Sequence, residues 1–377
     1  MLQVCAVDFT AFHFLLPLMR AAKRDGWRVE FACADGPLID PVRREGFAYR
    51  RIQITRGASP VAQLRATLQL ARSLRRDPPD VVHTHTPAGG MVGRAAAMLG
   101  FRGKVVHTLH GLPFEQAPRG IREHAFLLAE RVVARRTDYF FSQARGDVVR
   151  ARRLGIVDPR RTSVIGNGVD LDRFAPDDSA RAAVRAELGI AADAVVVTFV
   201  GRLVREKGIL DLADAALALR GRTELRFLIV GESLPSDRTG VGPSLARHPV
   251  AKALGRRWRL LGRRRDVERI LAATDIFTLP SYREGLPRSI IEAMAVGVPV
   301  IASRIPACVE LVREGETGLL VRVRDANALA AAIERLAFDP SLRHAMGERA
   351  REIAVAEHDE RVVVARQLEV LAGVVAR

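Results

Sequence analysis

Short apolar runs alternate with amphipathic stretches over the first 170 residues, and this pattern predicts alternating strands and helices. Brief apolar runs bounded by polar residues are typical of strands buried on both faces of a parallel sheet. Helical spacing of apolar positions predicts helices at Pro60–Arg76 and Ile121–Arg136, and the stretch up to Met19 predicts a strand, a loop and a helix. The alternation indicates a Rossmann-like domain. Its predicted strands are Leu2–Val7, Arg28–Cys33, Asp80–His83, Lys104–Leu109, Asp138–Ser142 and Thr162–Ile165.

The same rhythm returns after Val169–Asp178, a stretch rich in Asp and Pro that is typical of a linker. We therefore predict an α/β protein with domains at 1–170 and 191–357, a linker region at 171–190 and a C-terminal helix at 358–377. Ligands of open parallel sheets bind at the carboxyl ends of the strands, so we expect two such domains to face each other across a cleft. The second series has predicted strands at Ala194–Val200, Leu225–Val230, Trp258–Leu261, Asp275–Pro280 and Val298–Ser303, and predicted helices at Gly208–Arg220, Val267–Ala273, Pro287–Val296 and Ala326–Phe338.

Composition places the chain among globular proteins of a reducing compartment. Its 377 residues suit two domains, and 48% of them are hydrophobic. The three cysteines, Cys5, Cys33 and Cys308, follow neither a disulfide framework nor a metal-ligand spacing. The opening stretch lacks a basic leader, and no apolar run approaches the roughly 20 residues of a membrane span. We expect a cytoplasmic protein whose contact with a membrane, at the inner face, is peripheral.

The net charge of +16 falls mainly on the first half of the chain. Residues 1–170 hold 27 Lys or Arg against 15 Asp or Glu, a balance of +12, while residues 171–377 hold 32 against 28, a balance of +4. A basic surface attracts anionic lipid or a diphosphate-bearing molecule, although a chain that is simply Arg-rich throughout would show the same bias. The basic residues are not interleaved with aromatic ones and no nucleic-acid-binding motif occurs, so we expect no nucleic-acid partner.

The first candidate site follows the predicted strand that ends at Val200. The segment Gly201–Gly208 runs into a helix, and Arg202 and Lys207 flank a turn where free backbone N–H groups and the helix dipole favour an anion. No GxGxxG or GxxxxGK[ST] motif occurs, which argues against a dinucleotide site and a P-loop. Lys207 is one of four lysines among 59 basic residues, which suggests a site for a compact point charge. The segment predicts a diphosphate site; the alternative is that both cations are solvated surface groups.

The second candidate site is Glu284–Glu292, which also joins a predicted strand to a helix. If the helix begins near Pro287, then Glu284 precedes it and Glu292 lies along it, so the two carboxylates can contact different parts of one long ligand. Carboxylates accept hydrogen bonds from sugar hydroxyls, and free N–H groups after Gly285 can bind an anionic oxygen. Taken singly, Glu284 could be a helix N-terminal charge and Glu292 a surface residue.

Four histidines, His83, His85, His107 and His110, lie near predicted strand ends in the first domain. The pairs come from different strands and no acidic ligand is fixed nearby, so we predict no metal site. His83 and His107 lie within strand patterns and are expected to be packed. The sequence also lacks an Asp-x-Asp motif for a divalent ion, so neither a metal nor a cofactor is expected.

These segments resemble family 4 of the retaining glycosyltransferases. The resemblance rests on the two candidate sites together with Asn167–Asp170, Gly297–Val300 and His107–Gly111, and it covers nearly the whole chain. It implies the GT-B fold, in which a C-terminal helix crosses back to the first domain. The segment Asp80–Gly90 is similar to the branch that acts on polyprenyl-diphosphate-linked saccharides. One departure is the first loop, Phe9–His13, which lacks the Gly-Gly pair that many members carry.

The resemblance also implies roles for individual residues. Arg202 and Lys207 would bind the donor diphosphate, Glu284 the sugar and Glu292 the ribose. The backbone of Gly285, Leu286 and Pro287 would help to hold the sugar and the phosphates. The resemblance implies four catalytic residues: His110, Glu284, Arg202 and Lys207. It implies that the acceptor is bound by Phe9, Thr10 and His85.

We therefore predict a metal-independent, retaining glycosyltransferase. It would move a hexosyl or N-acetylhexosaminyl group from a nucleoside diphosphate sugar, expected to be UDP-linked, to a saccharide or polyprenyl-diphosphate-linked acceptor in polysaccharide or glycoconjugate synthesis. One alternative is a nucleotide-sugar epimerase of the same fold, which would turn over the donor without any acceptor. Another is a non-catalytic protein that binds nucleotide sugars and organises other enzymes, but such a protein has no need to keep all four residues Arg202, Lys207, Glu284 and Glu292.

Overall fold

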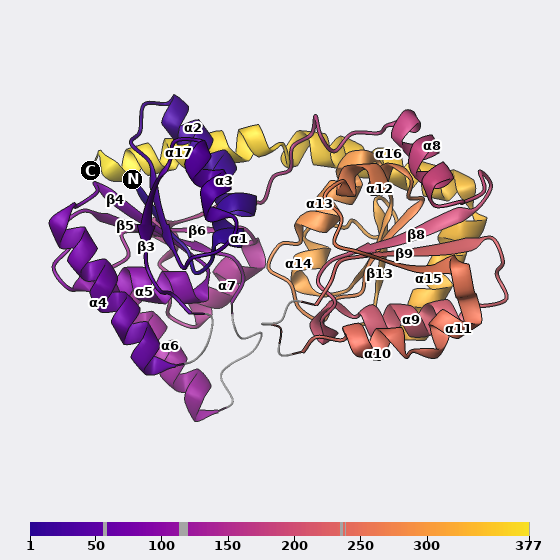
Figure 1. Cartoon of the computed structure of the whole chain (residues 1–377), viewed down its shortest axis with the longest axis horizontal. Coiled ribbons are helices and arrows are strands. Elements are labelled where there is room, and N and C mark those ends of the chain that lie inside the picture. Colours follow the sequence, from indigo (N-terminus) through magenta and orange to yellow (C-terminus); the bar gives the residue numbers. More distant parts are fainter. Residues whose placement is uncertain (56–58, 113–119, 234–236, 238, 377) are drawn as a thin grey trace. The chain divides into compact units, whose positions relative to one another are not determined.

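The computed structural model describes residues 1–55, 59–112, 120–233, 237 and 239–376. The chain divides into two compact units (Figure 1). The first unit comprises Met1–Asn167 and Arg361–Arg377, and the second comprises Gly168–Glu360. Each unit is built on its own parallel sheet, as the alternation of strands and helices predicts.

The first unit holds a seven-stranded parallel sheet of order β3-β2-β1-β4-β5-β6-β7. The central strands are buried on both faces, because helices cover the two sides of the sheet. The chain winds outward from β1 in one direction and from β4 in the other, so the switch point lies between β1 and β4. The strands are β1 (Leu2–Val4), β2 (Glu30–Cys33), β3 (Ala48–Arg51), β4 (Val81–His85), β5 (Lys104–Leu109), β6 (Tyr139–Ser142) and β7 (Thr162–Val164).

Three apolar clusters fix the helices of the first unit to the sheet. Leu70 and Val92 of α4 and α5 belong to one, Met19 of α2 and Leu371 of α17 to the second, and Leu127 of α6 to the third. The C-terminal helix α17 thus contributes to the core of the first unit. The helices are α1 (Asp8–Thr10), the π-helical turn η1 (Ala11–Leu15), α2 (Leu16–Arg24), α3 (Ile39–Arg44), α4 (Pro60–Arg76), α5 (Pro87–Met98), α6 (Ile121–Ala134), α7 (Arg145–Arg153), the 3-10 turn η2 (Pro159–Arg161) and α17 (Glu360–Val375).

The second unit holds a six-stranded parallel sheet of order β10-β9-β8-β11-β12-β13, whose switch point lies between β8 and β11. Its strands are β8 (Val195–Val200), β9 (Leu225–Val230), β10 (Trp258–Gly262), β11 (Ile276–Leu279), β12 (Val300–Ser303) and β13 (Gly318–Val321). Its helices are α8 (Asp178–Glu187), η3 (Arg205–Lys207), α9 (Ile209–Ala218), α10 (Gly242–Ala246), α11 (Pro249–Leu254), η4 (Gly255–Arg257), α12 (Val267–Ala272), α13 (Arg288–Val296), α14 (Pro306–Val309), α15 (Ala326–Phe338) and α16 (Pro340–Glu357).

The structure corrects the sequence prediction at the start of the chain. Strand β1 ends at Val4 rather than Val7, and Phe9–His13, predicted as a loop, is helical, because it lies in α1 and the π-helical turn η1. A Gly-Gly pair would favour a flexible turn here, but Phe9 to His13 all adopt helical geometry and Ala11 is fully buried. Thr10 and Phe9 are therefore held on a helix.

The region 171–190, predicted as a linker, contains α8. Asp177 caps this helix through its side chain, and Val184 lies fully buried in an apolar cluster of the second unit. Arg181 and Arg185 each donate to the carboxylate of Asp275, at 2.6 Å. The region is thus an integral part of the second unit, and the Asp and Pro residues at its start mark only the turn before the helix.

Candidate functional site

The two candidate segments of the second unit emerge side by side at the switch point of its sheet. Strand β8 leads into the turn that carries Arg202 and Lys207, and β11 leads into the segment that carries Glu284. Because β8 and β11 are neighbours in the sheet, their carboxyl ends bring the two segments together. The backbone N–H of Tyr282 donates to the Glu206 carbonyl oxygen at 2.8 Å, which ties one segment to the other.

Lys207 and Glu284 form the centre of this site. Lys207 Nζ lies 2.6 Å from Glu284 Oε1, and the Ser281 hydroxyl donates to the same oxygen at 2.6 Å. The two side chains are 20% and 9% exposed, so the charges interact away from bulk water. The second carboxylate oxygen of Glu284 and the remaining ammonium hydrogens of Lys207 can still bind a polar ligand. The structure thus brings together one cation and one carboxylate that the sequence places 77 residues apart.

Gly208 lets the two segments approach closely. Its φ is +66°, and a Cβ placed on it would lie 1.9 Å from the carbonyl oxygen of Pro280. A side chain is therefore excluded by both the backbone conformation and the space. Gly208 ends the 3-10 turn of Lys207 and caps the N-terminus of α9, where unpaired N–H groups favour negative charge.

Arg202 lies in the same turn but has a different partner. Its side chain is 53% exposed and pairs with Asp237, whose side chain is 5% exposed. The structure thus places the two predicted diphosphate-binding cations in one turn with separate partners, since Lys207 is bound to Glu284.

The two carboxylates of the Glu-x7-Glu pair have distinct surroundings. Helix α13 begins at Arg288, with Pro287 at its N-cap, so Glu284 precedes the helix and Glu292 lies within it. Burial raises the pKa of Glu292, and nearby Arg288 and Arg173 oppose this shift. Leu286 and Pro287 between the two glutamates are buried, which fixes the backbone that links them. The arrangement can therefore offer two separate hydrogen-bonding carboxylates to one elongated ligand.

A stack of three polar side chains lies next to the Glu284 segment, and no sequence motif marks it. Its members are Asp211, Tyr282 and Arg324. The Tyr282 hydroxyl donates to Asp211 Oδ1 at 3.0 Å, and the Arg324 guanidinium lies 4.8 Å from the centre of the Tyr282 ring. Arg324 has a left-handed backbone with φ of 60°, and burial raises the pKa of Asp211. Only the position of Tyr282, two residues before Glu284, hinted at this stack.

In the first unit, His85 and His110 are hydrogen-bonded to each other. His85 Nδ1 lies 3.1 Å from His110 Nε2, and His85 Nε2 lies 2.6 Å from Gln3 Oε1. His85 is 1% exposed, and both of its ring nitrogens are engaged in these two hydrogen bonds; its contact with an acceptor stays a prediction. Gln3 was not identified from the sequence, since a lone Gln inside a short strand gives no signal.

The other two histidines are packed within the sheet, as expected. His83 Nε2 lies 2.7 Å from the Thr108 hydroxyl, and His107 Nδ1 lies 2.9 Å from the Thr84 hydroxyl. Burial lowers the pKa of His83 to about 3 and that of His107 well below its ordinary value. Over the described residues, no three His, Cys, Asp or Glu side chains gather into a group that could hold a metal ion.

The remaining predicted contacts lie at the start of the first unit. The Phe9 side chain is partly exposed, and its ring lies 4.3 Å from that of His13, whereas Thr10 is buried. Both follow β1, next to β4 that carries His85, so all three lie at the switch point of the first sheet.

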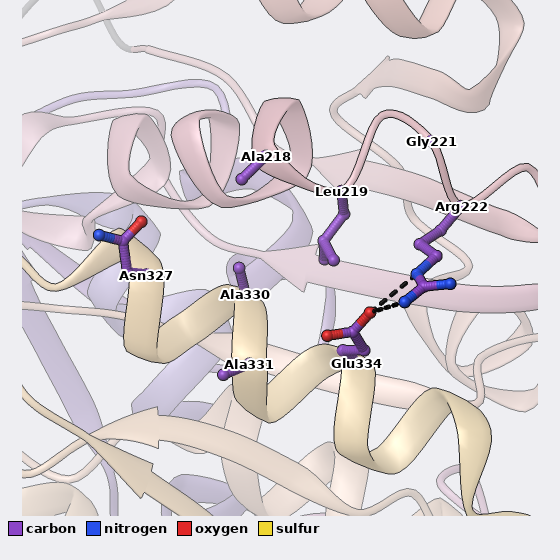
Figure 2. A pocket seen from close by; sticks show the side chains of 8 residues that line it. All are labelled: Ala218, Leu219, Gly221, Arg222, Asn327, Ala330, Ala331 and Glu334. Atoms are coloured by element: carbon purple, nitrogen blue, oxygen red, sulfur yellow. Dashed lines mark hydrogen bonds and ion pairs between the residues drawn. The ribbon is translucent and has the colours of Figure 1, made fainter.

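A separate groove of about 460 Å³ lies between α9 and α15 in the second unit (Figure 2). Arg222 at one end donates through Nε to Glu334 at 2.8 Å. Helix α9 starts at the Lys207 turn and runs about 15 Å before it reaches this groove near Ala218. The groove is therefore distinct from the Lys207–Glu284 site.

Comparison with known proteins identifies the family. The protein-family model described as "Glycosyl transferases group 1" matches residues 194–339, and the family model described as "Glycosyl transferase 4-like domain" matches residues 13–168. The UDP-Gal:alpha-D-GlcNAc-diphosphoundecaprenol alpha-1,3-galactosyltransferase of Escherichia coli is 31% identical over 344 residues, 87% of each chain. The D-inositol 3-phosphate glycosyltransferase of Corynebacterium glutamicum is 33% identical over 73% of this chain and 68% of its own.

Solved structures support the fold. The structure of Anabaena HepE in complex with UDP and glucose matches with a TM-score of 0.83 at 23% identity, covering 98% of each chain. That of WaaG, a glycosyltransferase involved in lipopolysaccharide biosynthesis, matches with a TM-score of 0.74 at 16% identity, covering 99% of this chain and 98% of its own. Two Rossmann-like units and these neighbours define a GT-B fold. The chain belongs to the group 1, family 4 type of glycosyltransferases, and it is an enzyme of that class.

Proposed function

We propose that this enzyme transfers a hexosyl or N-acetylhexosaminyl group from a UDP-linked sugar, with retention at the anomeric carbon. The acceptor would be a saccharide, in particular one linked to polyprenyl diphosphate, in the synthesis of a polysaccharide or glycoconjugate. The observation that carries the proposal is the Lys207–Glu284 pair at the switch point of the second sheet, next to the N-terminus of α9. The relative from Escherichia coli, whose name includes a UDP sugar and a diphosphoundecaprenol acceptor, supports the choice of substrates.

Each site residue has a role in this proposal. Lys207 and Arg202 stabilise the charge that develops on the departing diphosphate. Glu284 accepts hydrogen bonds from the sugar hydroxyls, Glu292 does so from the ribose, and the backbone N–H groups of Gly285 and Leu286 bind oxygens of the sugar or phosphate; Pro287, which has no N–H, fixes their direction. These two assignments for Glu284 and Glu292 agree with the separate surroundings of the two carboxylates.

Retention is attributed to attack from the face that the leaving group vacates. In this mechanism the leaving phosphate takes the acceptor proton, the acceptor oxygen forms the new bond to the anomeric carbon, and the bond to the phosphate oxygen breaks. His110 contacts the transferred sugar, a role that rests on the family resemblance. We expect product of unchanged anomeric configuration, which NMR of the purified product distinguishes from inversion.

The test is turnover of UDP-glucose, UDP-galactose and their N-acetyl forms, with and without a short-chain polyprenyl-diphosphate-linked GlcNAc acceptor. We expect UDP release and a lengthened acceptor only when both substrates are present. Conversion of the donor sugar without acceptor would indicate an epimerase. Binding of UDP without turnover of any donor would indicate a non-catalytic protein.

Metal independence follows from the same electrostatic argument, because two fixed cations can stabilise a departing nucleoside diphosphate without a divalent ion. We predict that turnover after dialysis against EDTA equals turnover in the presence of Mg²⁺ or Mn²⁺. A requirement for either ion would contradict the roles given to Lys207 and Arg202. The Lys207→Ala variant should lose most of its turnover under both conditions.

We further propose that the layer of α4, α5 and α6 contacts an anionic membrane that carries the acceptor. Half of the large apolar side chains exposed in the described residues lie in or next to these three helices: Val61, Leu64, Leu68, Met98, Leu99, Ile121, Leu128 and Val132. We call this set the α4–α6 face; the three helices lie side by side in Figure 1, and α5 packs against both others. Helix α4 carries four arginines and no acidic residue. None of the described helices has the length and apolar character needed to cross a membrane.

Flotation with phosphatidylglycerol vesicles tests this contact. We expect the protein to bind these vesicles, to bind phosphatidylcholine vesicles weakly, and to lose binding in Leu64→Glu, because the new charge lies among the exposed apolar side chains. Leu260→Glu, which changes an exposed apolar residue of the second unit, is the matched control and should bind as the wild type does. Equal loss of binding in both variants would contradict the role of the α4–α6 face.

A further inference from the structure

A chain of hydrogen-bonding side chains crosses the carboxyl edge of the first sheet. Gln3 belongs to β1 and His85 to β4, while His110 directly follows β5 and Gln143 directly follows β6. These four strands are consecutive in the sheet, so the four side chains meet in the order of the strands. Gln3 bonds to His85, His85 to His110, and His110 to the side chain of Gln143.

The contacts of Gln3 decide where the protons lie in this row of hydrogen-bonded side chains. The Gln3 amide nitrogen donates to Met1 Sδ at 3.2 Å, so its oxygen Oε1 faces His85 and accepts from His85 Nε2 at 2.6 Å. With its proton on Nε2, the neutral His85 ring has an acceptor at Nδ1. His110 Nε2, 3.1 Å from that nitrogen, is therefore the donor, and His110 Nδ1 is left as an acceptor.

The surroundings keep both rings neutral. Burial lowers the pKa of His110 to about 4, and the hydrogen bond with Gln143 opposes this shift. Burial also holds the pKa of His85 well below its ordinary value, with further contributions from the charges that His83, His110 and His107 would carry. Glu130 of α6 borders the same small cavity as His110 and His107, and its carboxylate is paired with Arg94 at 2.7 Å. The charge of Glu130 is thus balanced.

The backbone next to His85 is held in a strained conformation. Thr86 is one of two non-glycine residues with a positive φ among those described, at 63°, and its hydroxyl donates to the His85 carbonyl oxygen at 2.5 Å. Strain of this kind persists only where the surrounding structure fixes it, and it is concentrated at functional sites. Thr86 borders the same cavity as His110.

We propose that Gln3 and His85 are positioning residues that hold His110 with its proton on Nε2, so that Nδ1 accepts a hydrogen bond from a substrate hydroxyl. This inference rests on the proposed function, in which His110 contacts the transferred sugar. Gln3 and His85 themselves are buried and act only through His110. The arrangement follows the general rule that the partner of one imidazole nitrogen sets the tautomer that the other presents.

The tautomer of His110 can be measured directly. In protein labelled with ¹⁵N at its histidines, a protonated and an unprotonated ring nitrogen have widely separated shifts, and His110→Asn assigns the signal. We expect the wild type at pH 7 to show a neutral His110 protonated at Nε2. In Gln3→Glu, the new carboxylate stabilises a protonated His85, whose Nδ1–H then donates to His110, so the His110 proton should move to Nδ1. A wild-type His110 protonated at Nδ1 or a Gln3→Glu variant with an unchanged tautomer would overturn the inference.

Kinetics then test the link to turnover. We expect Gln3→Glu and Gln3→Met to lower kcat about ten- to a hundredfold, by analogy with outer-shell partners that orient a functional histidine, with UDP affinity unchanged. Thr108→Val is the matched control: it removes the equally buried bond to His83, and it should keep wild-type kcat. A tautomer change without loss of kcat, or an equal loss in Thr108→Val, would refute the positioning role. If the wild type turns over no nucleotide sugar, the proposed function fails, while the ¹⁵N shifts still decide the tautomer.

Discussion

At the scale of single residues, the Lys207–Glu284 pair shows how the proposed binding site can be maintained without a ligand. Each charge would be costly alone in a site that is mostly shielded from water, and each compensates the other. A diphosphate would offer Lys207 a second anionic partner, and sugar hydroxyls would offer Glu284 new donors. The pair therefore keeps a charged site stable in the free enzyme.

This coupling gives a prediction on stability. Lys207→Met should lower the free energy of unfolding by about 1–3 kcal/mol, because it leaves the Glu284 carboxylate without its cation; the lower end reflects the 20% exposure of Lys207. Lys207→Met combined with Glu284→Gln should lose less than the sum of the two single changes. Urea unfolding of all four proteins measures the coupling, and strict additivity would contradict an interacting pair. Arg202→Met, which breaks a more exposed pair, should cost less than about 1 kcal/mol.

At the scale of elements, the turns after β8 and β11 depend on backbone geometry more than on side chains. The site exists because the turn that carries Lys207 passes directly against the carbonyl oxygen of Pro280. Gly208 makes this passage possible, since both its positive φ and its lack of a Cβ are required. The sequence indicated a glycine at the start of a helix, whereas the reason for it lies 72 residues away in Pro280.

We predict that Gly208→Ala is among the most damaging substitutions in the second unit. The added Cβ would meet the Pro280 carbonyl oxygen at 1.9 Å and would also strain a left-handed backbone, so we expect a loss of about 2–4 kcal/mol together with loss of UDP binding. Gly221→Ala is the control, because a Cβ there meets no atom within 4 Å and Gly221 has no positive φ. Thermal unfolding with and without UDP measures both effects. A Gly208→Ala protein that binds UDP as tightly as the wild type would refute the argument.

Two strands, β3 and β13, were not predicted from the sequence. Strand β3 has the sequence Ala48-Tyr49-Arg50-Arg51 at the edge of its sheet, and its polar side chains gave no apolar run. It is held by parallel pairing with β2 and by Arg50, which bonds to Glu30 and Asp77. Strand β13 is apolar but only four residues long, and it too was missed. Such strands form because they pair with a neighbouring strand, and this pairing is a tertiary contact that a local sequence pattern does not show.

At the scale of the whole molecule, four buried neutral histidines couple stability to pH. Burial lowers the pKa of His83 to about 3 and that of His110 to about 4, and it holds the pKa values of His85 and His107 well below their ordinary range. An unfolded histidine has a pKa near 6.5. As the pH falls below 6.5, the unfolded state takes up protons that the folded state does not, so the folded state loses stability.

We therefore predict that the free energy of unfolding falls between pH 7.5 and pH 5.5, before most carboxylates titrate. Each buried histidine contributes about 1.4 kcal/mol for each pH unit below its unfolded pKa. Urea midpoints at the two pH values measure the slope, and His83→Gln should make it shallower. A midpoint that rises toward pH 5.5 would contradict the burial of neutral histidines.

The sequence by itself determined the α/β class, the existence of two sheet domains and the segments that carry Arg202, Lys207, Glu284 and Glu292. These features depend on local order, namely the period of apolar positions and the spacing of a few polar residues within one turn or helix. The tertiary structure alone decided which of these residues meet. Lys207 and Glu284 come together because β8 and β11 are neighbours, and Gln3, His85, His110 and Gln143 line up because their strands are consecutive. Strand order depends on burial and pairing between distant segments, which no local pattern in the chain encodes.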